Sequence, residues 1–311
     1  MTLFRRILFI TRALVICLLA TRCQARRETH AHPSNSTVLD GDNLGFPVND
    51  TDEVGRIVVV RSEPKRIIAL LPSHTETLFA LGVGDRLIGV DDYSNFPTSA
   101  LRLPKLGGLY DVHLEALAML RPDLVLGSDK SPATAALEQL GITVWSATVQ
   151  RYDDVFDMIV RTGKLVGRRR QAEALVKQTQ LDIERVEKAL EGTTRVSVYY
   201  ELDPTPYAVG PKSFVGVLLS KAGGENVIPS TLGEFPKINP ELIAAANPGV
   251  ILGASLADIS KRPGWSSLRA VRDGRVFSLT PEEREVVVRP GPRLASGVRV
   301  LAHILHPEVS L

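Results

Sequence analysis

The sequence predicts an α/β protein with two lobes, each built on a parallel-type sheet flanked by helices, joined by one long helix. Three observations predict this fold. Short β-branched runs alternate with helical stretches, a long region lacks strand signals, and parts of the first half recur in the second. We expect an N-terminal α/β lobe at residues 56–150, a linking helix region at 151–192 and a C-terminal α/β lobe at 193–311.

The first 25 residues are expected to be a signal peptide, so the protein is expected to be exported and periplasmic or tethered at the cell surface. Arg5 and Arg6 form a positive start, and residues 13–20 form a short apolar core. Arg12 interrupts the apolar stretch and leaves it too short to span a bilayer stably.

Cys17 and Cys23 are the only cysteines, and both lie in this segment. The folded body is therefore expected to have no disulfide and no thiolate metal site. Cleavage after Ala25 fits the preference for small residues, whereas a lipid on Cys23 is the alternative, although Arg22 departs from the small residue expected before a lipidated cysteine. The polar composition of residues 26–55 predicts a flexible tether.

The positive net charge of +2 comes from the first 27 residues. Residues 1–27 contain six arginines and no acidic residue, and without them 31 basic residues face 35 acidic ones, a net charge of −4. We therefore expect no nucleic-acid partner. The hydrophobic fraction of 44% and the charged fraction of 23% are those of an ordinary globular protein.

The elements of the N-terminal lobe are predicted from alternating patterns. Strands are expected at 67–71, 87–90, 124–126 and 144–147, with helices at 75–81, 114–120 and 132–140. Between Ala172 and Leu190, apolar residues recur at spacings of three and four, which predicts one face of a long helix. In the second half, strands are expected at 196–200, 250–252 and 276–279.

An internal repeat relates the two halves. Residues 113–127 align without gaps on 239–253, so that Glu115 meets Glu241 at an offset of 126. Two weaker matches follow the same order and are 84–88 with 224–228 and 144–148 with 276–280. Two similar lobes predict a cleft between them, because ligands of open α/β sheets bind at the carboxyl ends of the strands.

The segment after the first strong strand is a candidate ligand contact. Ser73 and Glu76 have the spacing of a capping box, which alone would explain both residues. A helix start at a strand's carboxyl end also suits a polar ligand group, and Ser73 would then contact the ligand. His74 is either a ligand contact or a histidine at the solvent edge.

Glu115 and Glu241 each occupy the first turn of a predicted helix. Complementing the helix dipole would contribute about 0.3–1 kcal/mol and explains each residue singly. That role does not require the same position in both lobes. One exposed carboxylate per lobe suits docking onto two basic sockets of a symmetric partner.

Arg289 and Arg293 precede the last predicted helix. They would bind an anionic ligand bidentately, or pair with the nearby Glu282, Glu283 and Glu285. Motifs of catalysis are missing from the sequence, which has no P-loop, no GxGxxG after a strand, no HExxH and no GxSxG. We therefore expect no enzymatic activity, no cofactor and no metal site.

Several motifs, taken in order, resemble a known class of proteins. They are PSHTE at 72–76, GVGDRLIGV at 82–90, HLEALAMLRPDLVLGS at 113–128 and RPGPRL at 289–294. The chain from about Arg56 onward resembles the binding proteins of ABC importers for cobalamin, haem and iron–siderophore complexes. The resemblance implies two lobes bridged by a rigid helix, a permease with its ATPase as partner, and Glu115 and Glu241 as the docking residues.

The resemblance is strongest to the cobalamin-binding branch, so a corrinoid is the expected ligand. The resemblance places Tyr93, Tyr207 and Phe235 in an aromatic pocket. Two tryptophans of that branch are replaced here by Leu109 and Ser128, and Tyr110 is adjacent to Leu109. A ferric siderophore would instead use Arg289, Arg293 and either Lys130 or Lys212. Haem would need an axial ligand such as Tyr93, Tyr110 or His74.

The protein is expected to act as a monomer. It would meet the membrane only through the permease or through a lipid on Cys23. An alternative hypothesis is that the protein is a two-lobed, chelatase-like enzyme acting on tetrapyrroles or metals. His74 with Glu76 would then be the only candidate pair of catalytic residues in the sequence.

Overall fold

The computed structural model describes residues 45–204 and 207–311. The predicted signal peptide, Cys23 and most of the predicted tether lie outside the described residues. In the part of the chain that is described, no helix is long and apolar enough to cross a membrane.

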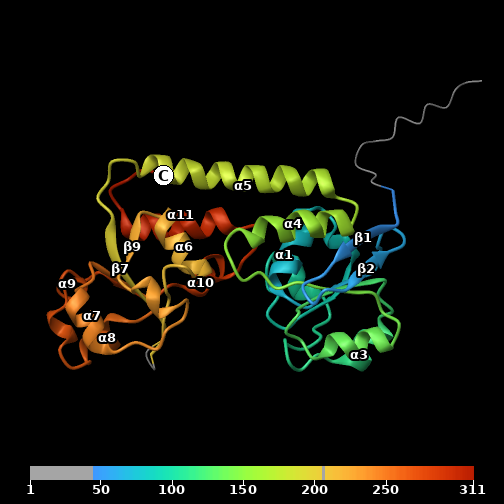
Figure 1. Cartoon of the computed structure of the whole chain (residues 1–311), viewed down its shortest axis with the longest axis horizontal. Coiled ribbons are helices and arrows are strands. Elements are labelled where there is room, and N and C mark those ends of the chain that lie inside the picture. Colours follow the sequence, from blue (N-terminus) through green and yellow to red (C-terminus); the bar gives the residue numbers. More distant parts are fainter. Residues whose placement is uncertain (1–44, 205–206) are drawn as a thin grey trace, which may run out of the picture. The chain divides into compact units, whose positions relative to one another are not determined.

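The N-terminal lobe contains a parallel sheet in the order β4-β3-β5-β6 (Figure 1). Its strands are almost wholly buried, as expected when helices cover both faces of a parallel sheet. The strands are β3 (Ile67–Ala69), β4 (Leu87–Val90), β5 (Leu124–Gly127) and β6 (Val144–Ser146), and the helices beside them are α1 (Pro72–Ala80), α2 (Leu114–Met119) and α3 (Ala133–Gln139). The predicted α/β lobe is confirmed, with each strand within two residues of its expected bounds.

The C-terminal lobe repeats this order of strands. β7 pairs in parallel with β9 on one side and with β10 on the other, and β11 follows β10. The order in each parallel sheet is therefore second, first, third, fourth strand, and this shared order agrees with the two similar lobes that the internal repeat predicts. A short additional strand, β8, runs antiparallel to the end of β7. The strands are β7 (Val196–Asp203), β8 (Tyr207–Ala208), β9 (Gly224–Asn226), β10 (Val250–Leu252) and β11 (Val276–Phe277).

Two of the three sequence matches superpose strands on strands. β5 and β10 begin 126 residues apart, and β6 and β11 begin 132 residues apart, as the alignments require. The third match is wrong in register. Residues 84–86 form a 3-10 helix before β4, whereas residues 224–226 already form β9.

Helices α4 (Asp154–Leu165) and α5 (Arg169–Ala189) occupy the predicted linking region. α5 packs against α4 at one end and against α11 and α6 of the C-terminal lobe at the other (Figure 1). Gly163 permits the close approach of α4 and α5, because a Cβ there would lie 2.4 Å from the Cβ of Ala172. The remaining helices are α6 (Phe214–Lys221), α7 (Pro240–Ala246), α8 (Leu256–Ser260), α9 (Arg269–Arg272), α10 (Pro281–Val288) and α11 (Leu294–Leu305).

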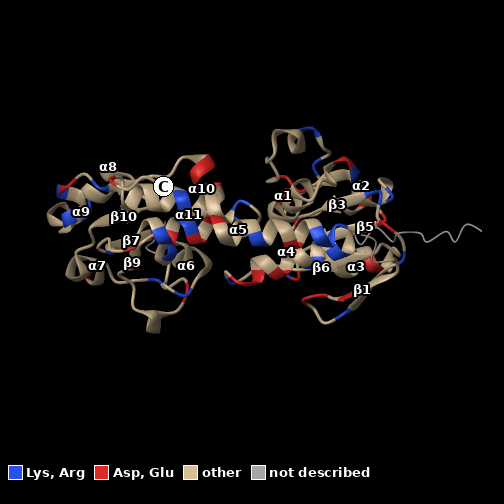
Figure 2. Ribbon diagram, turned by 90° about the horizontal axis from the view of Figure 1, so that it is seen from above, with Lys and Arg blue, Asp and Glu red and all other residues tan. Residues whose placement is uncertain are grey.

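One hydrophobic cluster connects the lobes through these helices. It includes Leu78 and Trp145 of the N-terminal lobe, Ile183 of α5, and Leu218 and Val298 of the C-terminal lobe. Positively and negatively charged residues are mixed along the α5 ribbon (Figure 2). Its exposed face carries local ion pairs such as Arg169 with Glu173, as expected for a solvated helix. The core therefore runs continuously beneath α5.

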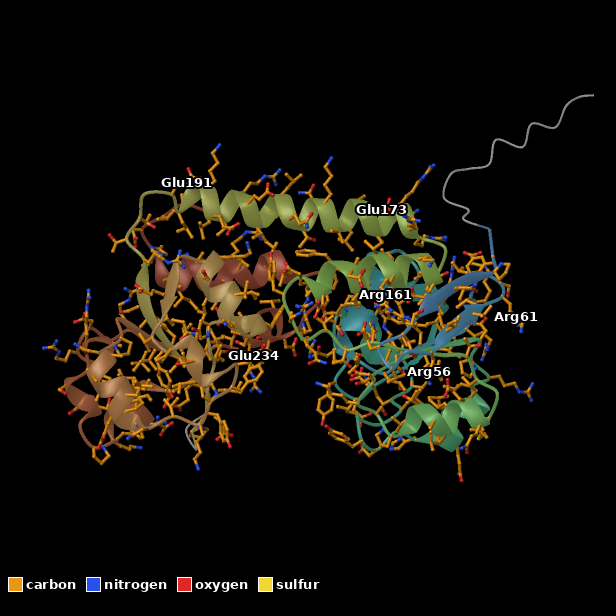
Figure 3. All side chains as sticks on the ribbon, in the orientation of Figure 1. Arg56, Arg61, Arg161, Glu173, Glu191 and Glu234 are labelled. Atoms are coloured by element: carbon orange, nitrogen blue, oxygen red, sulfur yellow. The ribbon has the colours of Figure 1, made fainter. Side chains whose placement is uncertain are left out.

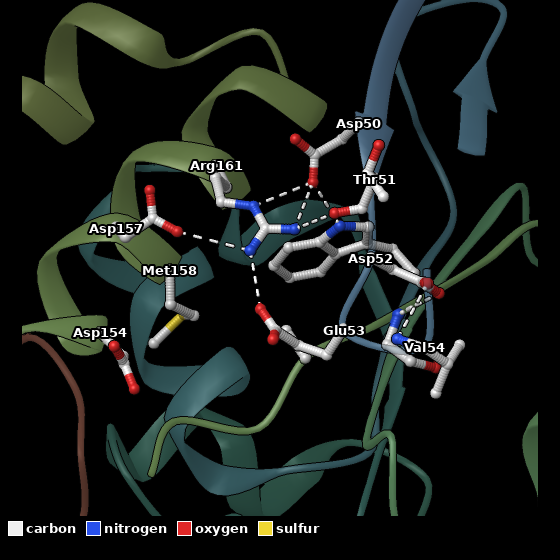
Figure 4. A network of polar contacts seen from close by, with 12 residues as sticks. Asp50, Thr51, Asp52, Glu53, Val54, Asp154, Asp157, Met158 and Arg161 are labelled. Atoms are coloured by element: carbon white, nitrogen blue, oxygen red, sulfur yellow. Dashed lines mark hydrogen bonds and ion pairs between the residues drawn. The ribbon is translucent and has the colours of Figure 1, made fainter. Parts of the chain in front are cut away.

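The prediction of a flexible tether up to residue 55 is wrong at its end. β1 (Val48–Thr51) forms an antiparallel hairpin with β2 (Ile57–Val60). Arg161 of α4 contacts Asp50 at 2.8 Å and Glu53 at 2.8 Å (Figure 4). Both residues are part of the polar composition that predicted a tether. In the structure the partly buried guanidinium group of Arg161, on a helix distant in sequence, holds them in place.

Candidate functional site

A cavity of about 440 Å³ is lined by both lobes where the carboxyl ends of their parallel strands meet. Its size lies in the range of small-molecule sites, and most of its lining is apolar. The N-terminal lobe and the segment after it contribute Lys130, Val149 and Gln150, and the C-terminal lobe contributes Leu202, Phe214, Val215, Glu234, Phe235, Val288 and Pro290. We call this cavity the interlobe pocket.

A larger hollow of about 550 Å³ lies along α11, beside Arg299, His303 and Leu311. None of its lining residues lies at the carboxyl end of a strand, and all of them belong to the C-terminal lobe. The interlobe pocket is therefore the better candidate for a ligand site.

Two residues predicted from the sequence, Lys130 and Phe235, line the interlobe pocket. Lys130 is placed by a tight turn after β5, in which the hydroxyl of Ser128 accepts a hydrogen bond from the Lys130 backbone at 3.0 Å and lies 2.7 Å from the hydroxyl of Thr148. Among the described residues of the lining, only Lys130 and Glu234 are charged, and their charges are opposite. Glu234 lies on the side of the C-terminal lobe that faces the N-terminal lobe (Figure 3).

Large aromatic side chains are exposed on the loops of both lobes. Tyr93 is 68% and Tyr110 is 74% exposed, and Tyr207, Phe235 and Phe96 are also exposed. The loops of Tyr93 and Tyr110 lie together, since a Cβ on Gly108 would lie 3.4 Å from the Tyr93 ring. Several exposed aromatic rings are typical of a binding surface. A ligand contact by Tyr93, Tyr110 and Tyr207 stays a prediction, and Phe96 was not predicted at all.

A group of polar side chains connects the lobes beside the pocket. The carboxylate of Glu76, on α1, is almost fully buried and accepts from two arginines of the C-terminal lobe. Arg289 Nη1 lies 3.1 Å from Glu76 Oε1, and Arg293 Nε lies 2.8 Å from Glu76 Oε2. Arg293 Nη2 adds a third contact at 2.5 Å. Both carboxylate oxygens of Glu76 are therefore engaged.

Two further residues complete this group. Arg289 donates to Asn95 Oδ1 at 2.7 Å and pairs with Glu285 at 3.1 Å, and Asn95 Nδ2 donates to Glu285 at 2.5 Å. We call Glu76, Asn95, Glu285, Arg289 and Arg293 the interlobe ion cluster. Its charges are two positive and two negative. Arg289 also donates to the backbone oxygen of Tyr93, and Arg293 lies 4.0 Å above the ring of Phe96, so the cluster holds the aromatic loop against the C-terminal lobe.

The cluster corrects two predictions. The capping box of Ser73 and Glu76 is wrong, because α1 begins at Pro72 and its N-cap residue, Leu71, makes no side-chain capping bond. Of the expected acidic partners of the two arginines, Glu285 is confirmed, whereas Glu283 instead caps α10 with Thr280. The main partner, Glu76, lies more than 200 residues away in sequence, so local spacing gave no sign of it.

His74 does not lie on the pocket surface. Its side chain is 1% exposed, and Nε2 lies 3.1 Å from the backbone oxygen of Ala147 and 3.3 Å from that of Gly127. Burial lowers the pKa of His74 to about 4, so the ring is neutral near pH 7. This burial contradicts the predicted roles of His74 as a ligand contact, an axial ligand or the partner of Glu76. Ser73 is also buried and lies against the backbone of Gly291, not in the pocket lining.

Glu115 and Glu241 are placed as the repeat predicts. Each is exposed in the first turn of a helix, α2 in one lobe and α7 in the other. α7 has a true side-chain cap, in which Asn239 Oδ1 accepts from the Glu241 backbone at 3.0 Å, while His113 at the start of α2 provides none. A role of both glutamates in docking to a permease stays a prediction.

The chain belongs to the periplasmic binding protein family, whose model matches residues 67–283. It is 32% identical over 277 residues to the uncharacterized ABC transporter substrate-binding lipoprotein YvrC of Bacillus subtilis, covering 85% of this chain and 87% of that protein. It is 27% identical to a cobalamin-binding protein of Halobacterium salinarum, covering 94% and 84%.

Among solved structures, the chain is similar to the periplasmic haem-binding protein RhuT of Roseiflexus sp. RS-1. The TM-score is 0.69 at 25% identity, covering 78% of this chain and 98% of that one. The resemblance to the substrate-binding proteins of ABC importers, including the cobalamin, haem and iron branches, is confirmed.

Proposed function

We propose that this protein captures a corrinoid of the cobalamin type in the interlobe pocket and delivers it to an ABC permease, without enzymatic turnover. The observation that carries the ligand class is the charge balance of the site. Lys130 and Glu234 are the charged residues of an otherwise largely apolar lining. The arginines beside it face Glu76 and Glu285. A bulky ligand without net charge, such as cyanocobalamin, suits this balance.

The anionic alternatives are less well supported. A ferric siderophore with negative charge would need unpaired cations, but Arg289 and Arg293 are engaged by carboxylates. Haem would need an axial ligand, and His74 is buried. The exposed Tyr93 and Tyr110 keep haem as the second candidate, and a relative in structure is named a haem-binding protein. A chelatase-like enzyme is disfavoured because His74 and Glu76 contact other groups.

Equilibrium dialysis of the purified protein with cyanocobalamin, haemin and a ferric siderophore tests the proposal. We expect saturable 1:1 binding of cyanocobalamin and weaker binding of the other two. Dialysis is the direct measurement here because Trp145 and Trp265 are both buried in the cores and do not line the pocket. The absence of cyanocobalamin binding would refute the ligand assignment.

The permease-docking role of Glu115 and Glu241 is tested by charge reversal. Glu115→Lys with Glu241→Lys should abolish uptake in cells while the Kd for the ligand stays unchanged, because neither residue lines the pocket. Glu191→Lys, also exposed but next to the end of the linking helix, is the matched control and should transport normally. Normal uptake by the double variant would contradict the docking role.

We also propose that the protein works outside the cytoplasm, as the family and the lipoprotein relative suggest. Cell fractionation should find it outside the cytoplasm, and Cys23→Ser should release it from the membrane if Cys23 carries a lipid.

A further inference from the structure

We propose that Glu76 sets the charge selectivity of the interlobe pocket, by neutralising two arginines that would otherwise attract anionic ligands. This proposal rests on the proposed function for the identity of the pocket and goes beyond it by assigning a specificity-determining residue. It follows from the position, the burial and the charge of the interlobe ion cluster.

The arginines stand at the edge of the pocket. Arg289 lies between Val288 and Pro290, which both line it. The Arg289 side chain is 15% exposed and the Arg293 side chain is 19% exposed, so both side chains are partly open to solvent. A guanidinium has the planar shape that binds carboxylates and phosphates in pairs of hydrogen bonds. Two such groups at a pocket edge would ordinarily select an anion.

Glu76 occupies the donors that an anion would use. Its carboxylate is 2% exposed and accepts three hydrogen bonds from the two arginines. It comes from the opposite lobe, so it acts as an internal anion at the lobe contact. Glu285, the second carboxylate, is more exposed and pairs with Arg289 alone.

The charge at this position decides the selectivity. With Glu76 ionised, the two guanidinium and two carboxylate groups of the cluster balance. Removing the charge of Glu76 leaves one uncompensated positive charge in a partly buried place, where electrostatic attraction is stronger than in water. An added carboxylate on the ligand should then gain affinity, while an uncharged ligand should gain little.

The test uses two corrinoids that differ by one charge. Cyanocobalamin carries neutral amides on its ring, and its monocarboxylic acids, in which one amide is hydrolysed, carry one additional negative charge. The wild-type protein should prefer cyanocobalamin. In Glu76→Gln the affinity for the monocarboxylic acids relative to cyanocobalamin should rise about tenfold in low salt, and the gain should shrink in high salt.

Glu201→Gln is the matched control. Glu201 is equally buried and is bound by Arg262 at 2.5 Å and 2.7 Å, but this pair packs against Tyr199 and Trp265 inside the C-terminal lobe and not at the contact between the lobes. The ratio of affinities should therefore stay at the wild-type value. Adding Arg293→Gln to Glu76→Gln restores the balance of charge and should remove the gain. An unchanged ratio in Glu76→Gln, or the same rise in Glu201→Gln, overturns the proposal.

The single variant Arg293→Gln tests the same proposal if Glu76→Gln does not fold. It leaves Glu76 with Arg289 and gives the cluster one negative charge in excess, so the preference for cyanocobalamin should increase at least about threefold. An unchanged preference overturns the proposal.

Haemin, with two propionates, separates this proposal from the ligand assignment. If the wild type does not bind cyanocobalamin, the ligand assignment fails, but Glu76→Gln should still bind haemin more tightly than the wild type does. If Glu76→Gln binds haemin no more tightly, the charge proposal fails as well.

Discussion

The two lobes share one order of strands but differ in the polar groups buried in them. In the N-terminal lobe the helix after the first strand carries a neutral His74, whose ring contacts the carbonyl oxygens of Gly127, the last residue of β5, and Ala147, just after β6. In the C-terminal lobe the first strand carries Glu201, which is bound by Arg262 and by the hydroxyl of Tyr199 at 3.1 Å. The buried His74 is a neutral ring, whereas the buried Glu201 is one half of an ion pair.

The two lobes therefore share their backbone topology but not the side chains that form the site. A parallel sheet needs only buried apolar strands and connecting helices, which both halves supply. Ligand recognition needs different groups on the two sides of the cleft, so the loops at the strand ends have no reason to remain alike. The lobe contact shows this plainly, because a glutamate from one lobe meets two arginines from the other.

The largest expected effect lies in the C-terminal lobe. Glu201→Leu would leave the guanidinium of Arg262 without its carboxylate in a largely buried place. Breaking one partner of a buried pair costs about 3–5 kcal/mol. Urea unfolding should show this loss, and the double variant with Arg262→Leu should recover much of it. A loss below about 1 kcal/mol would show that the pair is solvated and not buried.

The N-terminal lobe should instead respond to pH. The pKa of His74 is about 4 in the folded protein, below the ordinary value of 6.5. The unfolded chain therefore binds the proton first as the pH falls. The stability from the neutral ring is complete above about pH 6.5, declines below it and is lost by about pH 4, a change of about 3 kcal/mol.

His74→Phe should remove most of this dependence. Urea unfolding between pH 7 and pH 4 measures it, and His303→Gln, an exposed histidine of α11, is the control that should keep the wild-type slope. An equal slope in His74→Phe would show that other groups titrate instead.

The smallest expected effect on stability is at the N-termini of α2 and α7, the helices that carry Glu115 and Glu241. Asn239→Ala removes the side-chain cap of α7 and should cost about 1 kcal/mol. His113→Ala at the matching position of α2 should cost little, because His113 makes no capping bond. Thermal unfolding of the two variants measures the difference, and equal losses would contradict the asymmetry.

Much of the fold was predictable because it depends on local patterns. The seven predicted strands all exist, and the α5 helix follows the apolar spacing between Ala172 and Leu190. The short strands β1, β2, β8 and β9 were not predicted. β8 has only two residues, and β1 is polar and held in place by Arg161 and Trp145. Such short strands depend on tertiary contacts, and their sequences are too short or too polar to show a strand pattern.

The site was predictable in part. Lys130 and Phe235 line the pocket, because residues just after a parallel strand or in a loop at its end face the cleft. His74 and Ser73 occupy the same kind of position, but the structure buries them. Sequence position alone does not distinguish a side chain that points into a cleft from one that points under it.

The sequence alone was enough to predict two similar α/β lobes, the linking helix and the placement of Glu115 and Glu241 on equivalent helices. These follow from hydrophobic periodicity and from an alignment of the chain with itself, which are local properties. The three-dimensional structure was needed to show that Glu76 pairs with Arg289 and Arg293, that His74 is buried and that residues 48–51 form a strand. Each depends on which distant side chains meet in space, because burial and pairing of charges are properties of the packed molecule and not of neighbours in the chain.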